Sequence, residues 1–316
     1  MMSQRERFLA AVAGAPVDRP PCTAWLHFAT DALPGDVFAA RHAEWFRRFD
    51  WDICKIVNDY RYPLPEGIET IDGPADLERF DRVAAAHPAF QEQPKAIKAL
   101  RAALGPDVPI MDTGFDPFQQ IMRKAGYDRA KVIFANKRES LRALDAVCET
   151  MGEYSRALKA AGCDAVFFSV NGAIKPPNAR GVDEETYRTF MRPFDIRMLE
   201  AMKGMTRVLH IHGTELDVKR VLDYPCEAIS VSDRLPGNPS LRELRAMTPK
   251  CLMGGINEAA VFERALPVLR AEVKDAVAQN GSMRNLILSP GCTIPAQTPT
   301  FVLKAFREAV VALGKA

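Results

Sequence analysis

The stretch VLHIHG at residues 208–213 is the most informative part of this 316-residue sequence. Its apolar residues favour a β-strand, and the glycine is typical of the turn that leaves one. Residues two apart on a strand point to the same side, so His210 and His212 converge on one point. The segment SPGCTIP at residues 289–295 places Cys292 behind a second apolar run. Two imidazoles and a thiol at strand ends can form a metal site.

The histidine strand is one of eight short apolar runs, which alternate with segments of helical periodicity as in repeated βα units. The runs are residues 22–28, 52–58, 108–112, 164–170, 208–212, 228–232, 251–255 and 285–289. Helices are expected at residues 3–12, 139–161, 184–203, 258–279 and 299–313. Eight such units predict an α/β fold, a (β/α)8 TIM barrel.

An open, doubly wound sheet is the alternative fold. Its usual phosphate-binding loop is missing, because the sequence contains neither GxGxxG nor GxxxxGK[ST]. No linker rich in Pro, Gly or Ser divides the chain. We therefore predict one barrel domain over residues 1–316, with residues 1–21 as an N-terminal helix and turn.

Composition narrows the classes of partner. Lys and Arg number 42 and Asp and Glu number 40, a net charge of +2 without blocks of one sign, which argues against nucleic-acid and membrane binding. The expected partner is a small molecule or another protein. A homodimer is compatible with this composition. The N-terminus is charged and no apolar run approaches about 20 residues, so we expect a soluble, cytoplasmic protein. Seven cysteines without a CxxC pair predict no disulfide framework.

The predicted strands end in polar residues. In a (β/α)8 barrel the active site lies at the carboxyl ends of the strands, so these residues should surround one cavity. They are His27, residues 58–61, Asp112, Ser169, Asn171, Lys175, His210, His212, residues 232–234, Asn257, Glu258 and Cys292.

Each of these residues also has a structural interpretation. Asp59 could cap a turn, and Asp233 with Arg234 could form an ion pair that stabilises a loop. Glu258 is expected in the first turn of a helix, where an acid suits the helix dipole. The two histidines could be hydrogen-bonded structural residues. His42 and His87 are expected at the surface, and the six cysteines other than Cys292 in the core.

In order along the chain, these motifs resemble the uroporphyrinogen decarboxylase superfamily. RERFLAA at residues 5–11 and VDRPP at 17–21 are similar to its N-terminal helix and turn. WDICKIVND at residues 51–59 is similar to its second strand, and Asp59 falls at the position of its catalytic aspartate. The histidine strand, ISVSD at 229–233, MGGIN at 253–257 and the segment from PGC at 290–292 through TP at 298–299 resemble its last four units.

The resemblance departs from the true decarboxylase after the first strand. That enzyme carries an arginine-rich segment there for the carboxylates of its porphyrinogen, whereas WLHFATD at residues 25–31 has no arginine. Asp31 would repel a carboxylate. The zinc-dependent branch that moves methyl groups between corrinoid proteins and thiols carries His-x-Cys on this strand and Cys in the last loop. Here the pattern is His210-x-His212 with Cys292.

The resemblance therefore implies an enzyme, and we expect methyl transfer from a methylcorrinoid or similar donor to a thiol. His210, His212 and Cys292 would bind Zn²⁺, and a corrinoid would sit on a separate partner protein. Asp59, His27 and Asp233 are the expected catalytic residues. The expected substrate-binding residues are Tyr60, Arg61, Asn171, Lys175, Arg234 and Asn257.

Two other functions stay open. The first is a metal-free decarboxylase of an acetate-bearing tetrapyrrole or aromatic substrate, in which Asp59 stabilises a protonated intermediate. Its cations for the substrate carboxylates would be Arg61, Lys55, Lys175 and Arg234. The second is a barrel that binds a ligand without turnover. Bound zinc distinguishes the methyltransferase from both.

Overall fold

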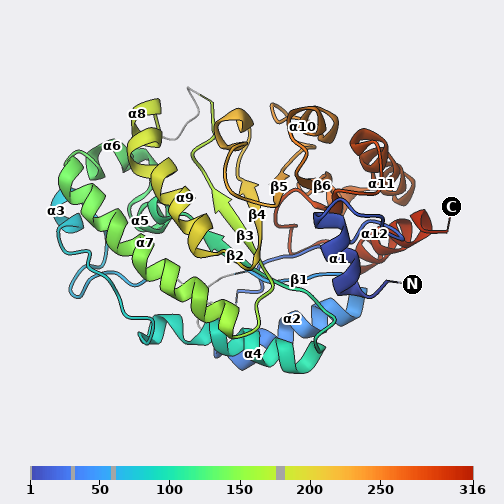
Figure 1. Cartoon of the computed structure of the whole chain (residues 1–316), viewed down its shortest axis with the longest axis horizontal. Helices are drawn as coiled ribbons and strands as arrows, with labels where there is room; N and C mark the ends of the chain where they lie inside the picture. Colours follow the sequence, from blue (N-terminus) through green and yellow to red (C-terminus); the bar gives the residue numbers. More distant parts are fainter. Residues whose placement is uncertain (1, 30–32, 58–61, 176–181, 316) are drawn as a thin grey trace.

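The protein is built around a curled sheet of parallel strands with helices on its outside (Figure 1). The computed structural model describes residues 2–29, 33–57, 62–175 and 182–315. Within them, seven strands pair in sequence order, which is the arrangement of a TIM barrel. The strands are β1 Cys54–Lys55, β2 Ile110–Phe115, β3 Ala165–Val170, β4 Thr206–Ile211, β5 Ala228–Val231, β6 Cys251–Ile256 and β7 Leu286–Pro290.

The expected α/β, TIM-barrel-like fold is confirmed, but the first predicted run, residues 22–28, does not form a regular strand. Only Cys22 makes a parallel bridge, to Leu288 of β7. The carbonyl of Cys22 also accepts a hydrogen bond from the Asp52 amide, at 2.9 Å. The segment thus bonds to both edges of the sheet, at the place of an eighth strand. Beyond Cys22 the bonds leave the ladder, because the Thr23 hydroxyl donates to the Ile53 carbonyl at 2.9 Å and the Trp25 carbonyl accepts from the Ile294 amide, in the loop after β7, at 3.1 Å.

Helices follow most strands and cover the outer face of the sheet. The α-helices are α1 Gln4–Val12, α2 Gly35–Phe49, α3 Pro74–Leu77, α4 Glu92–Leu104, α5 Pro117–Ala125, α6 Ala130–Ile133, α7 Lys137–Ala160, α8 Glu184–Thr186, α9 Arg192–Ala201, α10 Leu241–Met247, α11 Leu266–Asn280 and α12 Thr300–Leu313. Figure 1 shows α5, α7 and α9 on one side, α10 to α12 on the opposite side, and α2 beside α4. None of the described helices combines the length and apolar character needed to cross a bilayer.

Two predicted helices have different boundaries. The run at residues 184–203 is interrupted by a π-helical turn over Tyr187–Met191, between α8 and α9. The run at 258–279 contains a 3-10 turn at Val261–Glu263 and becomes α-helical only at Leu266, the start of α11. Pro267 lies in the first turn of α11, where its missing N–H costs no helical bond. The residues before α11, including Glu258, therefore lie outside the helix.

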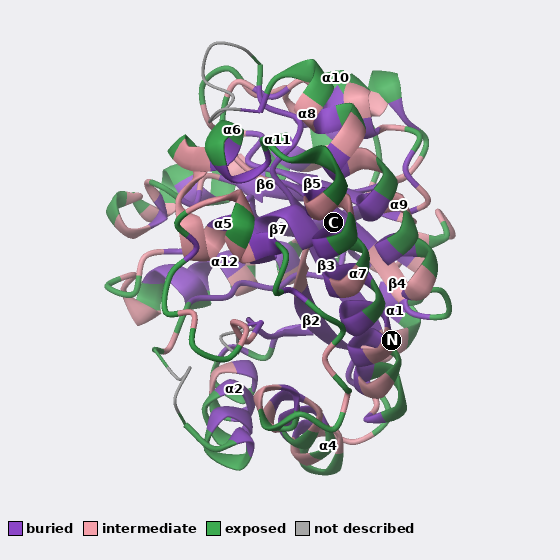
Figure 2. Ribbon diagram, turned by 90° about the vertical axis from the view of Figure 1, so that its left-hand side faces the viewer, coloured by how far each residue is buried: buried purple, intermediate pink, exposed green. Residues whose placement is uncertain are grey.

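The core fills the space inside the sheet and between sheet and helices. Figure 2 shows the strands almost wholly buried, with exposure concentrated on the outer faces of the helices. All cysteines are free thiols, and the six other than Cys292 are buried as expected. The expectation that His42 lies at the surface is wrong. It is buried on α2, stacked on Phe38 at 4.1 Å and edge-on to Phe28 at 4.9 Å.

A charge cluster closes the amino-terminal end of the barrel. Asp52, fully buried just before β1, accepts hydrogen bonds from Arg7 Nη1 at 2.8 Å and from both terminal nitrogens of Arg19 at 2.6 and 2.8 Å. The Cys22 amide donates a further bond at 2.9 Å, and Arg307 Nη1 lies at 3.5 Å. This cluster ties α1, the segment before Cys22 and α12 to the first strand.

Candidate metal centre

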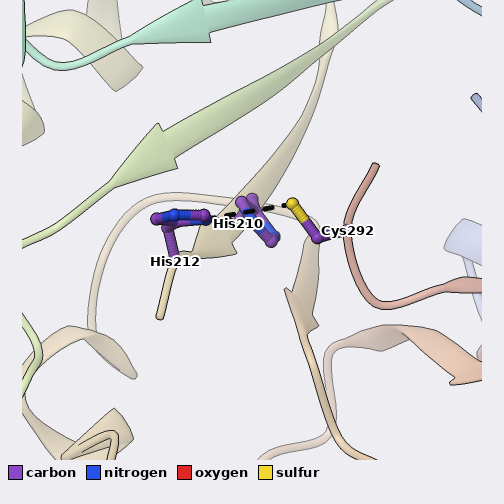
Figure 3. Close-up of side chains that lie close together, drawn as sticks. All are labelled: His210, His212 and Cys292. Carbon is purple, nitrogen blue, oxygen red and sulfur yellow. Dashed lines mark hydrogen bonds between the residues drawn. The ribbon is translucent and has the colours of Figure 1, made fainter. Parts of the chain in front are cut away.

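The two histidines predicted to converge do so at the carboxyl end of β4. His210 is the penultimate residue of the strand and His212 lies one residue beyond it, with its amide bonded to the Val170 carbonyl of β3 at 3.0 Å. Cys292 lies two residues beyond the end of β7. Figure 3 shows the thiol and both imidazoles pointing toward one another.

The spacing of these three side chains suits a tetrahedral metal ion. His210 Nε2 lies 3.4 Å from His212 Nδ1, which lies 3.9 Å from Cys292 Sγ. The ligand atoms all fall within 4.8 Å of one another. A zinc ion with bonds of about 2.0–2.1 Å to nitrogen and about 2.3 Å to sulfur holds such atoms roughly 3.3–3.6 Å apart. Small movements would therefore complete the site.

His210 is held in place from two sides. Its Nδ1 lies 3.3 Å from Ser230 Oγ on β5, which leaves Nε2 directed at His212 and Cys292. Its ring stacks on Phe167 of β3 at 4.5 Å. Burial, with the neighbouring His212 and Lys55, lowers the pKa of His210 well below its usual range. The ring is thus neutral at pH 7, as metal ligation requires, and Ser230 acts as the orienting partner that ligating histidines normally have.

Gly291 allows the loop that carries Cys292 to approach β5 closely. A Cβ at this position would lie 2.4 Å from Ser232 Cα and 2.9 Å from Glu258 Oε2. Only glycine fits there without moving backbone. Burial raises the pKa of the Cys292 thiol, and the negative charge of Glu258 raises it further. Without a metal the group is therefore a thiol, and binding of a metal would deprotonate it.

Glu258 is a site residue that sequence reasoning placed wrongly. It was expected in the first turn of a helix, but it lies eight residues before α11 in a buried turn, 6% exposed. Its oxygens accept no hydrogen bond of normal geometry from the described residues, and burial raises its pKa. The sequence did contain a signal for the later start of this helix, because proline is favoured in the first turn and Pro267 lies there.

The residues predicted around Asp233 form a supporting layer. Asp233 Oδ1 accepts a hydrogen bond from the Gly255 amide at 2.7 Å, and burial raises the pKa of this carboxyl to about 6. Arg234 turns toward α11, with bonds to the Gly255 carbonyl at 2.9 Å and Asp275 at 2.6 Å. These contacts fit the loop-stabilising interpretation of Arg234. Asn257 caps a turn by accepting the Ala260 amide at 3.1 Å.

The other predicted site residues lie in different surroundings. Asn171 is buried directly after β3, and its amide atoms have no partner among the described residues. Lys175 is exposed, and its amide bonds to the Glu215 carbonyl. His27 is exposed and lines a groove with Trp45 and Thr298 instead of joining the metal group. Asp59, Tyr60 and Arg61 lie outside the described residues.

Asp112 does not belong to the ring of groups expected at the cavity. Its Oδ1 accepts a hydrogen bond at 2.7 Å from Gln93 on α4, so it faces the helices. The next inward position on β2 is Thr113, which donates to the Ile56 carbonyl at 2.7 Å. Alternation of side chains along a strand explains the error, because a shift of one residue reverses the face.

A second buried pair of carboxyls lies at the same end of the sheet. Asp116 follows β2 and caps α5 by accepting the Gln119 amide at 2.6 Å. Burial raises its pKa to about 7. Asp195 of α9 is also buried, accepts a bond from Tyr224 Oη at 2.9 Å, and has its pKa raised by burial and by the charge of Asp116. Neither carboxyl forms an ion pair within the described residues.

Comparison with known proteins agrees with this architecture. The family model for uroporphyrinogen decarboxylase (URO-D) matches residues 60–313, and the chain belongs to this family. Among curated proteins, none matches this sequence.

Solved structures with a similar fold include methyltransferases. A methyltransferase from Methanosarcina mazei superposes with a TM-score of 0.77 at 21% identity, over 100% of both chains. A putative vitamin-B12 independent methionine synthase from Listeria monocytogenes gives 0.57 at 14% identity, over 89% of this chain and 86% of that one. A B12-independent methionine synthase from Shewanella sp. W3-18-1 gives 0.51 at 16% identity, over 70% and 66%. At these identities the likeness shows the fold.

Proposed function

We propose that this protein is a zinc-dependent methyltransferase that delivers a methyl group to a thiol. The observation that carries the proposal is the convergence of His210, His212 and Cys292 within 4.8 Å at the carboxyl ends of two strands. Three protein ligands leave one tetrahedral position for a substrate, which is the pattern of catalytic rather than structural zinc sites. The fold shared with methyltransferases supports the same reaction class.

The donor set fits zinc chemistry. A zinc ion held there would lower the pKa of a thiol at its open position, so that the sulfur becomes nucleophilic at neutral pH. Two imidazoles and one thiolate leave a net positive charge on the site, which strengthens this effect relative to a site with two thiolates. Ser230 and Phe167 keep the His210 ring in the orientation that the site needs.

The methyl donor in this proposal is a methylcorrinoid carried by a separate protein. The S–CH3 bond forms as the methyl–cobalt bond breaks, with its electron pair left on cobalt and the thiol proton released when sulfur binds. Asp233, whose pKa burial raises to about 6, and Asp59 are the proposed groups that orient the substrate or accept that proton.

The test is transfer from free methylcobalamin to 2-mercaptoethanol, followed by mass spectrometry of the S-methyl product and by the absorbance of the corrinoid. Zinc-loaded wild-type protein should form the product, and His212→Ala should not. His87→Ala is the matched control, because His87 is exposed and remote from the group. Zinc-loaded protein that transfers no methyl group, or His212→Ala with full activity, would contradict the proposal.

Decarboxylation of a tetrapyrrole is the alternative function, because the chain belongs to the uroporphyrinogen decarboxylase family. A uroporphyrinogen site must neutralise many carboxylates, and each one buried without a partner costs several kcal/mol. The segment at residues 25–31 contains neither arginine nor lysine for this purpose. Anaerobic incubation with uroporphyrinogen, followed by chromatography of the oxidised porphyrins, should show no stepwise loss of carboxylates. Loss at a useful rate would favour the decarboxylase.

A further inference from the structure

A basic groove lies at the amino-terminal end of the barrel, opposite the candidate metal centre. It measures about 730 Å³ and is formed by residues that precede or begin β3, β4 and β5, together with residues of α1, α4 and α7. Two acidic residues line it against five cations, which are Arg5, Arg101, Lys159, Lys203 and Arg207. The groove thus carries a net charge of +3, whereas the whole chain carries +2. Positive charge is concentrated in a hollow that has the size of a small-molecule site.

The three arginines of the groove are held by carboxylates of the protein itself. Arg5 Nη2 bonds to Asp164 Oδ1 at 2.8 Å, and Arg101 forms an ion pair with the other oxygen of the same side chain. Arg207 donates to both oxygens of Glu227, at 3.2 Å from Nε and 2.6 Å from Nη2. These bonds fix the guanidinium groups as part of the wall of the groove, to which they contribute positive charge.

The two lysines of the groove have no such partner. Neither Lys159 nor Lys203 forms an ion pair with any of the described residues. Lys159 lies in the last turn of α7, and Lys203 lies in the turn between α9 and β4. Lys159 Nζ bonds to the Lys203 carbonyl at 3.4 Å, and both side chains are exposed. Two neighbouring lysines are therefore available to an anion.

Gly204 makes room for the ammonium group of Lys159. Its φ is +90°, a backbone conformation that glycine adopts without strain, and a Cβ at this position would overlap Lys159 Nζ. A lysine in the last turn of a helix suits the helix dipole wherever its side chain points. The dipole alone does not account for a turn that admits this ammonium beside Lys203.

We propose that this groove binds a ligand through a diphosphate group, at a site separate from the metal centre. Five like charges in one groove repel one another, and the two acidic residues offset them only in part. Phosphate oxygens accept charge-assisted hydrogen bonds from ammonium groups, and a diphosphate can reach both lysines at once. Leu9, 47% exposed, also lines the groove and offers apolar surface to the organic part of a nucleoside diphosphate.

Calorimetric titration at low ionic strength tests the site, with pyrophosphate, ADP and orthophosphate as probes. Wild-type protein should bind pyrophosphate or ADP about tenfold more tightly than orthophosphate, because only a diphosphate reaches both ammonium groups. Tighter binding of ADP would identify an organic diphosphate as the ligand, and tighter binding of pyrophosphate an inorganic one. No binding at millimolar concentration, or no advantage of either diphosphate over orthophosphate, would overturn the proposal.

Three variants separate the groove from other causes of anion binding. The double variant Lys159→Met, Lys203→Met should weaken diphosphate binding by about tenfold or more, because it removes both unpaired ammonium groups. The matched control is Lys274→Met, Lys304→Met, since these lysines are exposed on α11 and α12, on the side of the sheet opposite α7 (Figure 1). This control and His212→Ala, which removes a candidate metal ligand, should both keep the wild-type affinity. Binding that survives the first double variant, or that is lost in His212→Ala, would contradict the inference and leave the proposed function untouched.

Discussion

The two ends of the barrel treat buried charge in opposite ways. At the amino-terminal end, Asp52 has no exposed surface and both its oxygens accept bonds from guanidinium groups. At the carboxyl end, the oxygens of Glu258 accept no hydrogen bond of normal geometry from the described residues, and the side-chain amide of Asn171 is buried without a partner among them. The Asp52 cluster stabilises the fold, because all the groups that bond to Asp52 belong to the protein itself. The arrangement at the carboxyl end leaves bonding capacity that a ligand can satisfy.

The pKa values of the carboxyls reflect this difference. Burial acts to raise the pKa of Asp52, but the hydrogen bond and charge of Arg19 and the charge of Arg307 bring it below its usual value. Burial raises the pKa of Asp116, Asp195, Asp233 and Glu258 at the other end. The amino-terminal end should therefore lose stability as pH falls through the lowered pKa. The carboxyl end should lose stability as pH rises through the raised ones.

The largest expected effect is at Asp52. Asp52→Ala leaves the guanidinium groups of Arg7, Arg19 and Arg307 without their buried counter-charge, so the free energy of unfolding should fall by about 3–5 kcal/mol. Urea unfolding measures it. The control, Asp81→Ala, removes an exposed partner of Arg142 and should cost about 0–1 kcal/mol. If the two variants lost the same free energy of unfolding, the Asp52 cluster would stabilise the protein no more than a surface ion pair does.

A smaller effect of opposite sign is expected at Asp116. Asp116→Asn keeps a capping side chain for α5 and removes a buried charge, so stability above pH 7 should rise by roughly 1–3 kcal/mol. The gain should shrink as pH falls from about 7 toward about 4, because the Asp116 carboxyl of the wild type is then protonated in the folded protein and increasingly also in the unfolded one. Thermal unfolding across this pH range is the measurement. A variant less stable than wild type at neutral pH would show that the charged form is needed.

The smallest effect concerns the bond between Ser230 and His210. Ser230→Ala leaves all three candidate ligands in place but removes the partner of His210 Nδ1. Zinc affinity should fall by about 10- to 100-fold, while zinc at saturation stays unchanged. Competition with a chelator of known affinity measures this. Unaltered affinity would mean that Phe167 alone orients the ring.

The fold could be predicted from the sequence because the same pattern, an apolar run followed by a helical segment, recurs along the chain. Eight apolar runs predicted the parallel sheet, and seven of them became strands. The run at residues 22–28 did not, since Thr23 Oγ1 and the Trp25 carbonyl bond outside the ladder and leave a single bridge at Cys22. The start of α11 was missed for a local reason, because Pro267 fixes the first helical turn well after Glu258.

The candidate site was predictable where strand alternation alone decides which way a side chain points. His210 and His212 are two apart on one strand, and they do share a side. Asp112 was assigned to the wrong face because the register of β2 is set by its pairing with β1 and β3, which a single sequence does not reveal. Ser230 and Phe167 depend on the same pairing, as both stand opposite or beside His210 only in the assembled sheet. The closeness of Gly291 to Ser232 is likewise a property of the fold.

The most direct test of the account is the zinc content of protein purified without chelators. We expect about one zinc per chain in the wild type and in His87→Ala, and none retained in His212→Ala or Cys292→Ala, since a site with three protein ligands rarely survives the loss of one. Elemental analysis of the four proteins decides it. Wild-type protein that holds no zinc and takes up none on addition would contradict the central claim that His210, His212 and Cys292 form a metal centre.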